Sequence, residues 1–145
     1  YKFYKIFIIW TQDDYFQYRW IKASDGNTQT AGNYIWSQYY AAENSGAGPN
    51  RYGANSESKG MITYWNGTDG GSNITEVTIQ DPYHSNEFST LKADTVTNTG
   101  NTLHHQLTSS IYYGHESHRG IFLYGAAGDS INSTNFRYVV LGAKI

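Results

Sequence analysis

Apolar and polar residues alternate along most of this 145-residue chain, and the alternation constrains the fold more than any other feature. Phe16, Tyr18 and Trp20, for example, alternate with the polar residues Gln17 and Arg19. Successive side chains of a β-strand point to opposite faces, so this spacing predicts a strand whose aromatic face is buried. No stretch of useful length shows the i, i+3, i+4, i+7 spacing of an amphipathic helix. The sequence therefore predicts an all-β protein.

Turn-forming residues divide the chain into about eight or nine expected strands, a number typical of a two-sheet sandwich. The expected strands are residues 1–10, 16–21, 34–42, 61–65, 75–80, 88–96, 103–111, 118–124 and 135–143. We expect a two-sheet antiparallel β-sandwich with a jelly-roll topology.

Two of these expectations concern particular segments. Residues 1–10 carry apolar side chains on both faces, so we expect a central strand covered on both sides, paired in a hairpin with residues 16–21. Residues 43–59 are rich in Gly, Asn and Ser and contain Pro49, which predicts a surface loop.

The length fits one domain with one core, so we expect a single β-sandwich domain over residues 1–145. Because the chain starts at Tyr1 and enters a strand almost at once, we expect it to be the C-terminal part of a longer chain. There is no cysteine, so burial rather than disulfides must stabilise the fold. The longest apolar stretch runs only from Ile6 to Trp10, which predicts no membrane insertion.

Charge argues against nucleic acid as a partner. The net charge is −2, only 15% of the residues are charged, and the lysines and arginines are scattered along the chain. A protein that binds duplex nucleic acid usually concentrates basic residues on one face. We therefore expect no nucleic-acid partner.

Histidine offers the best candidates for a metal site, because His104, His105, His115 and His118 lie close together in the sequence and could meet across a hairpin. His104 and His105, however, point to opposite faces of a strand. The segment His115-Glu116-Ser117-His118 also lacks the helical spacing with which His-Glu-x-x-His holds zinc. We expect no metal and no cofactor, with His105 partly buried among leucines; His104, His115 and His118 are the weak candidates for ligands.

The carboxylates do not form a recognisable catalytic pair. Glycoside hydrolysis needs two of them at a fixed separation across a cleft, whereas each glutamate here lies in polar or turn-rich surroundings. The glutamates are Glu43, Glu57, Glu76, Glu87 and Glu116. Neither a phosphate-binding loop nor a Gly-x-Ser-x-Gly elbow is present in the sequence. We expect a non-enzymatic protein.

Aromatic residues make up 17% of the chain, including fourteen tyrosines, and most of them must build the core because leucine is scarce. Aromatic residues beside loops are the better surface candidates, since an aromatic ring can pack on the apolar face of a sugar. The expected binding residues are Tyr39, Tyr40, Tyr52, Trp65, Tyr83 and Tyr112. We expect recognition to be carried by the polar loops at residues 43–59 and 66–73.

Three segments carry a resemblance to a known group of proteins: the opening YKFYKIFII at residues 1–9, FQYRW at 16–20, and the ending FRYVVLGAKI at 136–145. With these segments the strand framework resembles small jelly-roll domains of bacteriophage virion proteins, found in tail fibres, spikes and capsid decorations. The ending is similar to the usual close of that group, an aromatic strand terminated by a glycine and a lysine.

The resemblance implies a phage structural protein that mediates assembly, attachment to the host surface, or both. It implies a homotrimer located on the extracellular surface of the virion, with copies of itself, other virion proteins and a host-surface glycan as partners. Two other readings stay open: a secreted carbohydrate-binding module, and a fragment of a glycosidase.

Overall fold

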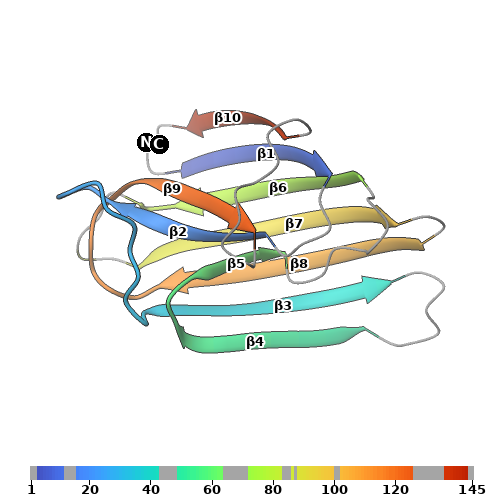
Figure 1. Ribbon diagram of the computed structural model, residues 1–145, viewed down its shortest axis with the longest axis horizontal. Helices are drawn as coiled ribbons and strands as arrows, with labels where there is room; N and C mark the ends of the chain where they lie inside the picture. The colour runs from blue at the N-terminus through green and yellow to red at the C-terminus, as the bar shows by residue number, and fades with distance from the viewer. Residues whose placement is uncertain are drawn as a thin grey trace.

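The computed structural model describes residues 3–11, 16–42, 49–63, 72–82, 86, 88–99, 102–125 and 136–143. Within these ranges the chain forms ten strands, all paired antiparallel in two sheets, and no helix (Figure 1). Accordingly, no helix of the described part is long and apolar enough to cross a membrane. The expected all-β fold and two-sheet antiparallel sandwich are confirmed.

The two sheets are unequal. The larger has seven strands in the order β10-β1-β6-β7-β8-β3-β4, and the smaller has three in the order β5-β2-β9. The strands of the larger sheet are β1 Phe3–Thr11, β3 Tyr34–Ala42, β4 Asn50–Glu57, β6 Ser72–Gln80, β7 Ser89–Thr99, β8 Thr102–Tyr112 and β10 Arg137–Ala143. Those of the smaller sheet are β2 Phe16–Lys22, β5 Gly60–Thr63 and β9 His118–Gly125. The described strands divide seven and three between the two sheets, which makes the sandwich uneven. The expected jelly-roll topology stays a prediction.

The core lies between the sheets, where β2 places its aromatic face. Phe16, Tyr18 and Trp20 are all buried, as their alternation with polar residues predicts. They pack with Tyr34 and Ile62, from the larger sheet and from β5 respectively. The smaller sheet therefore acts as an aromatic lid on one face of the larger sheet.

The expectation that residues 1–10 are covered on both faces is wrong. Ile8 and Trp10 of β1 are buried against the core, but Phe7 and Ile9 on the other face are 38% and 50% exposed. The strand is flanked by β10 and β6 within its sheet, as expected for an inner strand. Its outer face is exposed because the sandwich has only one covering sheet.

The expected hairpin of the first two strands is also wrong, because β1 belongs to the larger sheet and β2 to the smaller one. The smaller sheet instead pairs β2 with β5 and β9. A crossing from one sheet to the other lets the aromatic face of β2 lie over the apolar face of β1, so that both are buried.

Part of the segment expected as a loop, residues 43–59, is a strand. Residues 50–57 form β4, which pairs with β3 at the edge of the larger sheet, while residues 43–48 lie outside the described ranges. The composition of this strand is polar because most of its side chains are exposed. An edge strand needs main-chain pairing on one side only and tolerates such a composition.

Candidate functional site

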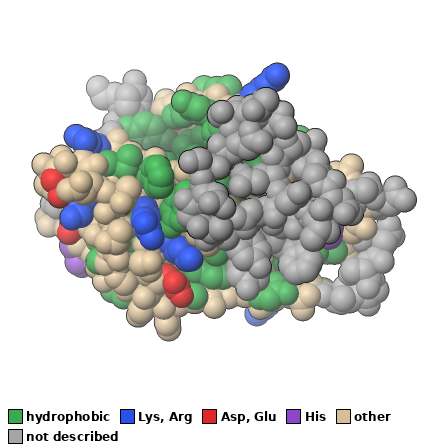
Figure 2. Space-filling view, viewed as in Figure 1, with side chains coloured by type: hydrophobic (Ala, Val, Ile, Leu, Met, Phe, Trp, Pro, Cys, Tyr) green, Lys and Arg blue, Asp and Glu red, His purple; other side chains and the backbone are tan. Residues whose placement is uncertain are grey.

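Within the described residues, the smaller sheet leaves one side of the larger sheet uncovered. Its edge strand β9 stops short of the end of the larger sheet, where β1 and β10 lie (Figure 1). Figure 2 shows apolar side chains gathered at this end of the molecule. We call the region between β9 and β10 the open side; it is the candidate site.

Two adjoining cavities run along the open side, with volumes of about 180 Å³ and about 420 Å³. Both are lined by Ile6 of β1, Ile121 of β9 and Val140 of β10, so they form one groove. The larger cavity also has Phe136 and Tyr138 in its wall. The groove is apolar because it continues the inner face of the larger sheet beyond the smaller sheet.

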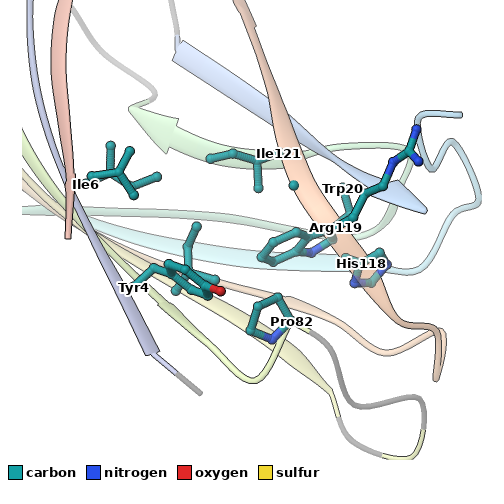
Figure 3. A pocket seen from close by; sticks show the side chains of 10 residues that line it. Tyr4, Ile6, Trp20, Pro82, His118, Arg119 and Ile121 are labelled. Carbon is teal, nitrogen blue, oxygen red and sulfur yellow. The ribbon is translucent and has the colours of Figure 1, made fainter. Parts of the chain in front are cut away.

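His118 lies at the inner end of the groove, among the residues drawn in Figure 3. Its ring is fully buried, stacks on Trp20 with centroids 5.0 Å apart, and has Nδ1 2.9 Å from the Ser89 hydroxyl. Burial lowers the pKa of His118 to about 4, so the imidazole is neutral at pH 7. Its backbone N–H donates to the Pro82 carbonyl, 2.6 Å away. This histidine is a packed part of the wall.

Arg119, the next residue, does not bring charge into the groove. Figure 3 shows its side chain extending away from Tyr4, Ile6 and Ile121. Its guanidinium lies instead against Gly26, at a point that a Cβ atom on the glycine would occupy. Gly26 has a positive φ of 78°, which favours glycine, and a Cβ atom there would displace the flexible Arg119 side chain. The groove keeps apolar walls and so favours an apolar occupant.

The second element of the open side is the edge strand β10. Four consecutive apolar residues, Tyr138, Val139, Val140 and Leu141, are 64%, 57%, 49% and 54% exposed. Among the described strands β10 pairs only with β1, so no described strand pairs with the backbone N–H and C=O groups along its other edge. Protein edge strands are usually protected by charges, proline or a bulge. Apart from Arg137 at its start, β10 has none of the three, and its register with β1 is regular.

The residues expected to bind a ligand do not form one platform. Tyr39 is exposed on the outer face of β3, whereas Tyr40 points to the inner face, where its ring stacks on His104 and its hydroxyl lies 2.6 Å from His104 Nδ1. Tyr52 lies on β4 and is 36% exposed. Trp65 and Tyr83 lie outside the described residues.

The expectation that Tyr112 is at the surface is wrong, because its side chain is only 1% exposed. Its ring packs between Tyr34 and His118, with both centroid distances at 5.0 Å. A position next to a loop in the sequence suggested exposure, but Tyr112 is on the inner face of β8, where His118 of β9 packs on it. Its predicted binding role has no support from this position.

The histidines do not meet across a hairpin. His104 is near the start of β8, and His118 contacts Tyr112 at the end of that strand, about 26 Å away at the usual rise per residue. Among the described residues no group of three potential ligands could hold a metal. The expected burial of His105 is wrong: its side chain is 46% exposed and Nε2 lies 2.8 Å from an Asp94 carboxylate oxygen. His104 is the buried member of the two.

Sequence reasoning missed the open side, although a signal was present. Tyr138 to Leu141 is a run of apolar residues without alternation, next to the single basic residue Arg137. Such a run also fits a strand buried on both faces. Only the strand order, which places β10 at the end of its sheet, identifies it as an exposed edge.

Comparisons of the chain with protein-family models, with curated proteins and with solved structures found no match. The kind of site is therefore inferred from the geometry of the described strands. An unprotected apolar edge strand beside an apolar groove is the arrangement with which sheets accept a strand from another chain.

Proposed function

We propose that this chain is a non-enzymatic structural protein of a bacteriophage virion, a tail-fibre, spike or capsid-decoration domain that mediates assembly and attachment at the particle surface. The observation that carries the proposal is the edge of β10 with which no described strand pairs, exposed and apolar at Tyr138 to Leu141. An exposed strand of this kind is a hazard in a protein that stays single, because it pairs with other chains. In an assembly protein the same edge becomes a contact.

The outer face of the larger sheet supports the same proposal. Its exposed apolar side chains include Phe7, Ile9, Ile74, Val96, Leu103, Leu107 and Ile111. Between them lie an ion pair, Lys5 with Glu76, and a polar pair, His105 with Asp94. An extended apolar surface with a few charges is typical of contacts between proteins. Both the edge and the outer face are therefore suited to packing against neighbouring proteins of a shell or fibre.

Attachment to a host-surface glycan rests on fewer residues than the sequence predicted. Tyr39 and Tyr52 are the exposed candidates of the described part, and they lie on neighbouring strands. Tyr39 points to the outer face of the sheet, whereas Tyr52, opposite Gln38, points to the inner side. This arrangement offers two separate contacts, so the alternative of a carbohydrate-binding module stays a prediction.

The proposal is tested on intact phage particles whose genome encodes the chain. We expect mass spectrometry to find the chain in purified particles, and gold-labelled antibodies against it to mark a tail structure or the capsid surface in electron micrographs. A chain that is made in infected cells but is absent from purified particles would contradict the proposal.

Attachment is tested separately with Tyr52→Ala and Tyr39→Ala. Because both side chains are partly exposed, we expect each variant to keep its unfolding free energy within about 1 kcal/mol. If either residue contacts the host, adsorption of particles to cells falls. Unchanged adsorption in both variants would assign host contact to other residues.

A further inference from the structure

We propose that β10 pairs antiparallel with β10 of a second copy of this chain, in a register centred on Val140, so that two larger sheets join across a two-fold axis. This inference rests on the proposed assembly function and names the partner and the contact.

The free edge of β10 determines the kind of contact. One edge of the strand is hydrogen-bonded to β1 from Arg137 to Ala143, and no described strand lies along the other. Its side chains are exposed on both faces of the sheet. An added strand would pair the free backbone groups and cover both faces at once. A contact made by side chains on one face would leave that edge unpaired.

The register follows from which face each side chain occupies. Tyr138 and Val140 lie opposite Ile8 and Ile6 of β1 and share the inner face with them. Val139 and Leu141 lie on the outer face. A two-fold axis perpendicular to the sheet keeps the outer faces of both copies on the same side, so outer residues must pair with outer residues.

Val140 is the middle residue of β10, which runs from Arg137 to Ala143. Centring the pair there lets the whole strand take part, with Val140 opposite Val140 of the second copy. Val139 then lies opposite Leu141, and Tyr138 lies opposite Gly142, where the missing side chain leaves room for the ring. A centre on Val139 would leave Gly142 and Ala143 without a partner.

Charge favours antiparallel over parallel pairing of two copies. Arg137 is the only charged residue of β10. Antiparallel pairing centred on Val140 separates the two Arg137 side chains by six residues along the strands, roughly 20 Å. That distance exceeds the Debye length of about 8 Å at physiological ionic strength. Parallel pairing would bring the two arginines side by side.

The contact also extends the groove. Tyr138 and Val140 form part of its wall, so the same residues of the second copy would continue that wall across the axis. A two-fold contact closes on itself and makes pairs of copies. It therefore differs from the trimer that the resemblance implies, and the measured number of copies decides between them.

Because the chain has no cysteine, single cysteines give a direct test of the register. We expect oxidised Val140→Cys to run as a disulfide-linked dimer on a non-reducing gel. The matched control is Val139→Cys, whose equivalent Cα atoms would be roughly 8 Å apart, beyond the reach of a disulfide. Little or no cross-linking of Val140→Cys, or equal cross-linking of both variants, overturns the proposal.

Light scattering on the purified chain gives a second test. We expect the mass of two chains for the unchanged protein, and the mass of one chain for Val140→Lys, which places two ammonium groups opposite each other. Ile35→Lys, at an exposed position of β3 away from the edge, is the control and keeps the pair. Circular dichroism verifies that each variant folds; if Val140→Lys does not, the cysteine variants decide.

The outcomes separate this inference from the proposed function. A single chain or a trimer in solution, with the chain still present on virions, overturns the pair and leaves the virion assignment standing. A two-fold pair formed by a chain that is absent from virions supports the contact and contradicts the virion assignment.

Discussion

The region around β2 and the open side both contain large apolar side chains, but these side chains are buried only in the first region. Beneath β2, the aromatic side chains are at most 1% exposed and their ring centroids lie 5.0 to 5.9 Å apart. We call this group the closed region; its members are Tyr18, Trp20, Tyr34, Tyr112 and His118. On the open side, Tyr138 to Leu141 are about half exposed. Position relative to the smaller sheet, rather than composition, decides which apolar residues are buried.

Some polar groups of the two regions differ in the same way, although Trp20 Nε1 and His118 Nε2 of the closed region have no hydrogen-bond partner among the described residues. In the closed region the Tyr18 hydroxyl donates to Ser110 Oγ at 2.9 Å, and the Trp20 backbone N–H donates to the Tyr34 hydroxyl at 2.9 Å. That hydroxyl donates in turn to the Gln29 carbonyl at 3.1 Å. On the open side, the outer edge of β10 has no such partners within the described chain. We infer that the closed region contributes mainly to stability and the open side mainly to association.

The largest test of this comparison is Trp20→Ala. Emptying the site of a fully buried large aromatic side chain should lower the unfolding free energy by about 3–5 kcal/mol. Phe122→Ala is the matched change on the open side, where the ring is 48% exposed, and should cost about 1 kcal/mol or less. Both values come from denaturant unfolding. Equal losses in the two variants would remove the distinction between the regions.

The next effect is a pH dependence that belongs to the closed region. The pKa of His118 is lowered from 6.5 to about 4 by burial, so the unfolded chain binds a proton there before the folded chain does. The part of the unfolding free energy that depends on neutral His118 is therefore fully present above pH 6.5. It is lost as the pH falls toward 4, and the loss is on the order of 3 kcal/mol.

His118→Phe isolates this contribution, because Phe keeps a flat ring against Trp20 but cannot be protonated. Burial also lowers the pKa of His104, which titrates in both proteins and cancels in the comparison. We expect the unfolding free energy of the variant to fall less than that of the unchanged protein between pH 6.5 and 4. Parallel pH profiles would show that His118 is not buried in solution.

Sequence patterns predicted the β2 part of the closed region, placed Tyr112 wrongly at the surface, and did not indicate the open side. The alternation around Tyr18 and Trp20 predicted their burial, because a half-buried strand has a period of two. Residues 34–42 were predicted as a strand with the bounds that β3 has, and Thr75, Val77 and Ile79 share a buried face as expected.

The failures concern long-range pairing. Whether residues 1–10 pair with 16–21 or cross to another sheet depends on contacts between distant segments, which a local period does not specify. The same holds for β4, whose polar composition resembles a loop but whose backbone pairs with β3. For β10 the pattern could not separate a covered strand from an exposed edge, since both contain uninterrupted apolar runs.

Removing single tyrosine hydroxyl groups should have an effect of intermediate size on the unfolding free energy. Tyr34→Phe removes the acceptor of the buried Trp20 backbone N–H, and leaving that donor unpaired should cost about 1–3 kcal/mol. Tyr124→Phe is the matched control, because the buried Tyr124 hydroxyl has no hydrogen-bond partner within the described part of the chain. We expect the control to change the unfolding free energy by less than about 0.5 kcal/mol. A larger loss for Tyr124→Phe than for Tyr34→Phe would contradict these assignments.

The smallest expected effect is that of a chelator, which should leave the melting temperature unchanged. Each buried histidine already has a local partner: the His104 ring stacks on Tyr40, and His118 Nδ1 lies beside the Ser89 hydroxyl. His104 lies near the start of β8, whereas His118 of β9 packs on Tyr112 at the other end of β8, so the two are too far apart to share an ion. If no metal ion is coupled to folding, removing metal ions changes the free energy of neither the folded nor the unfolded chain. A drop of several degrees that one divalent ion reverses would show that a metal stabilises the fold. The comparison would then change, because a bound ion, and not aromatic burial alone, would stabilise the closed region.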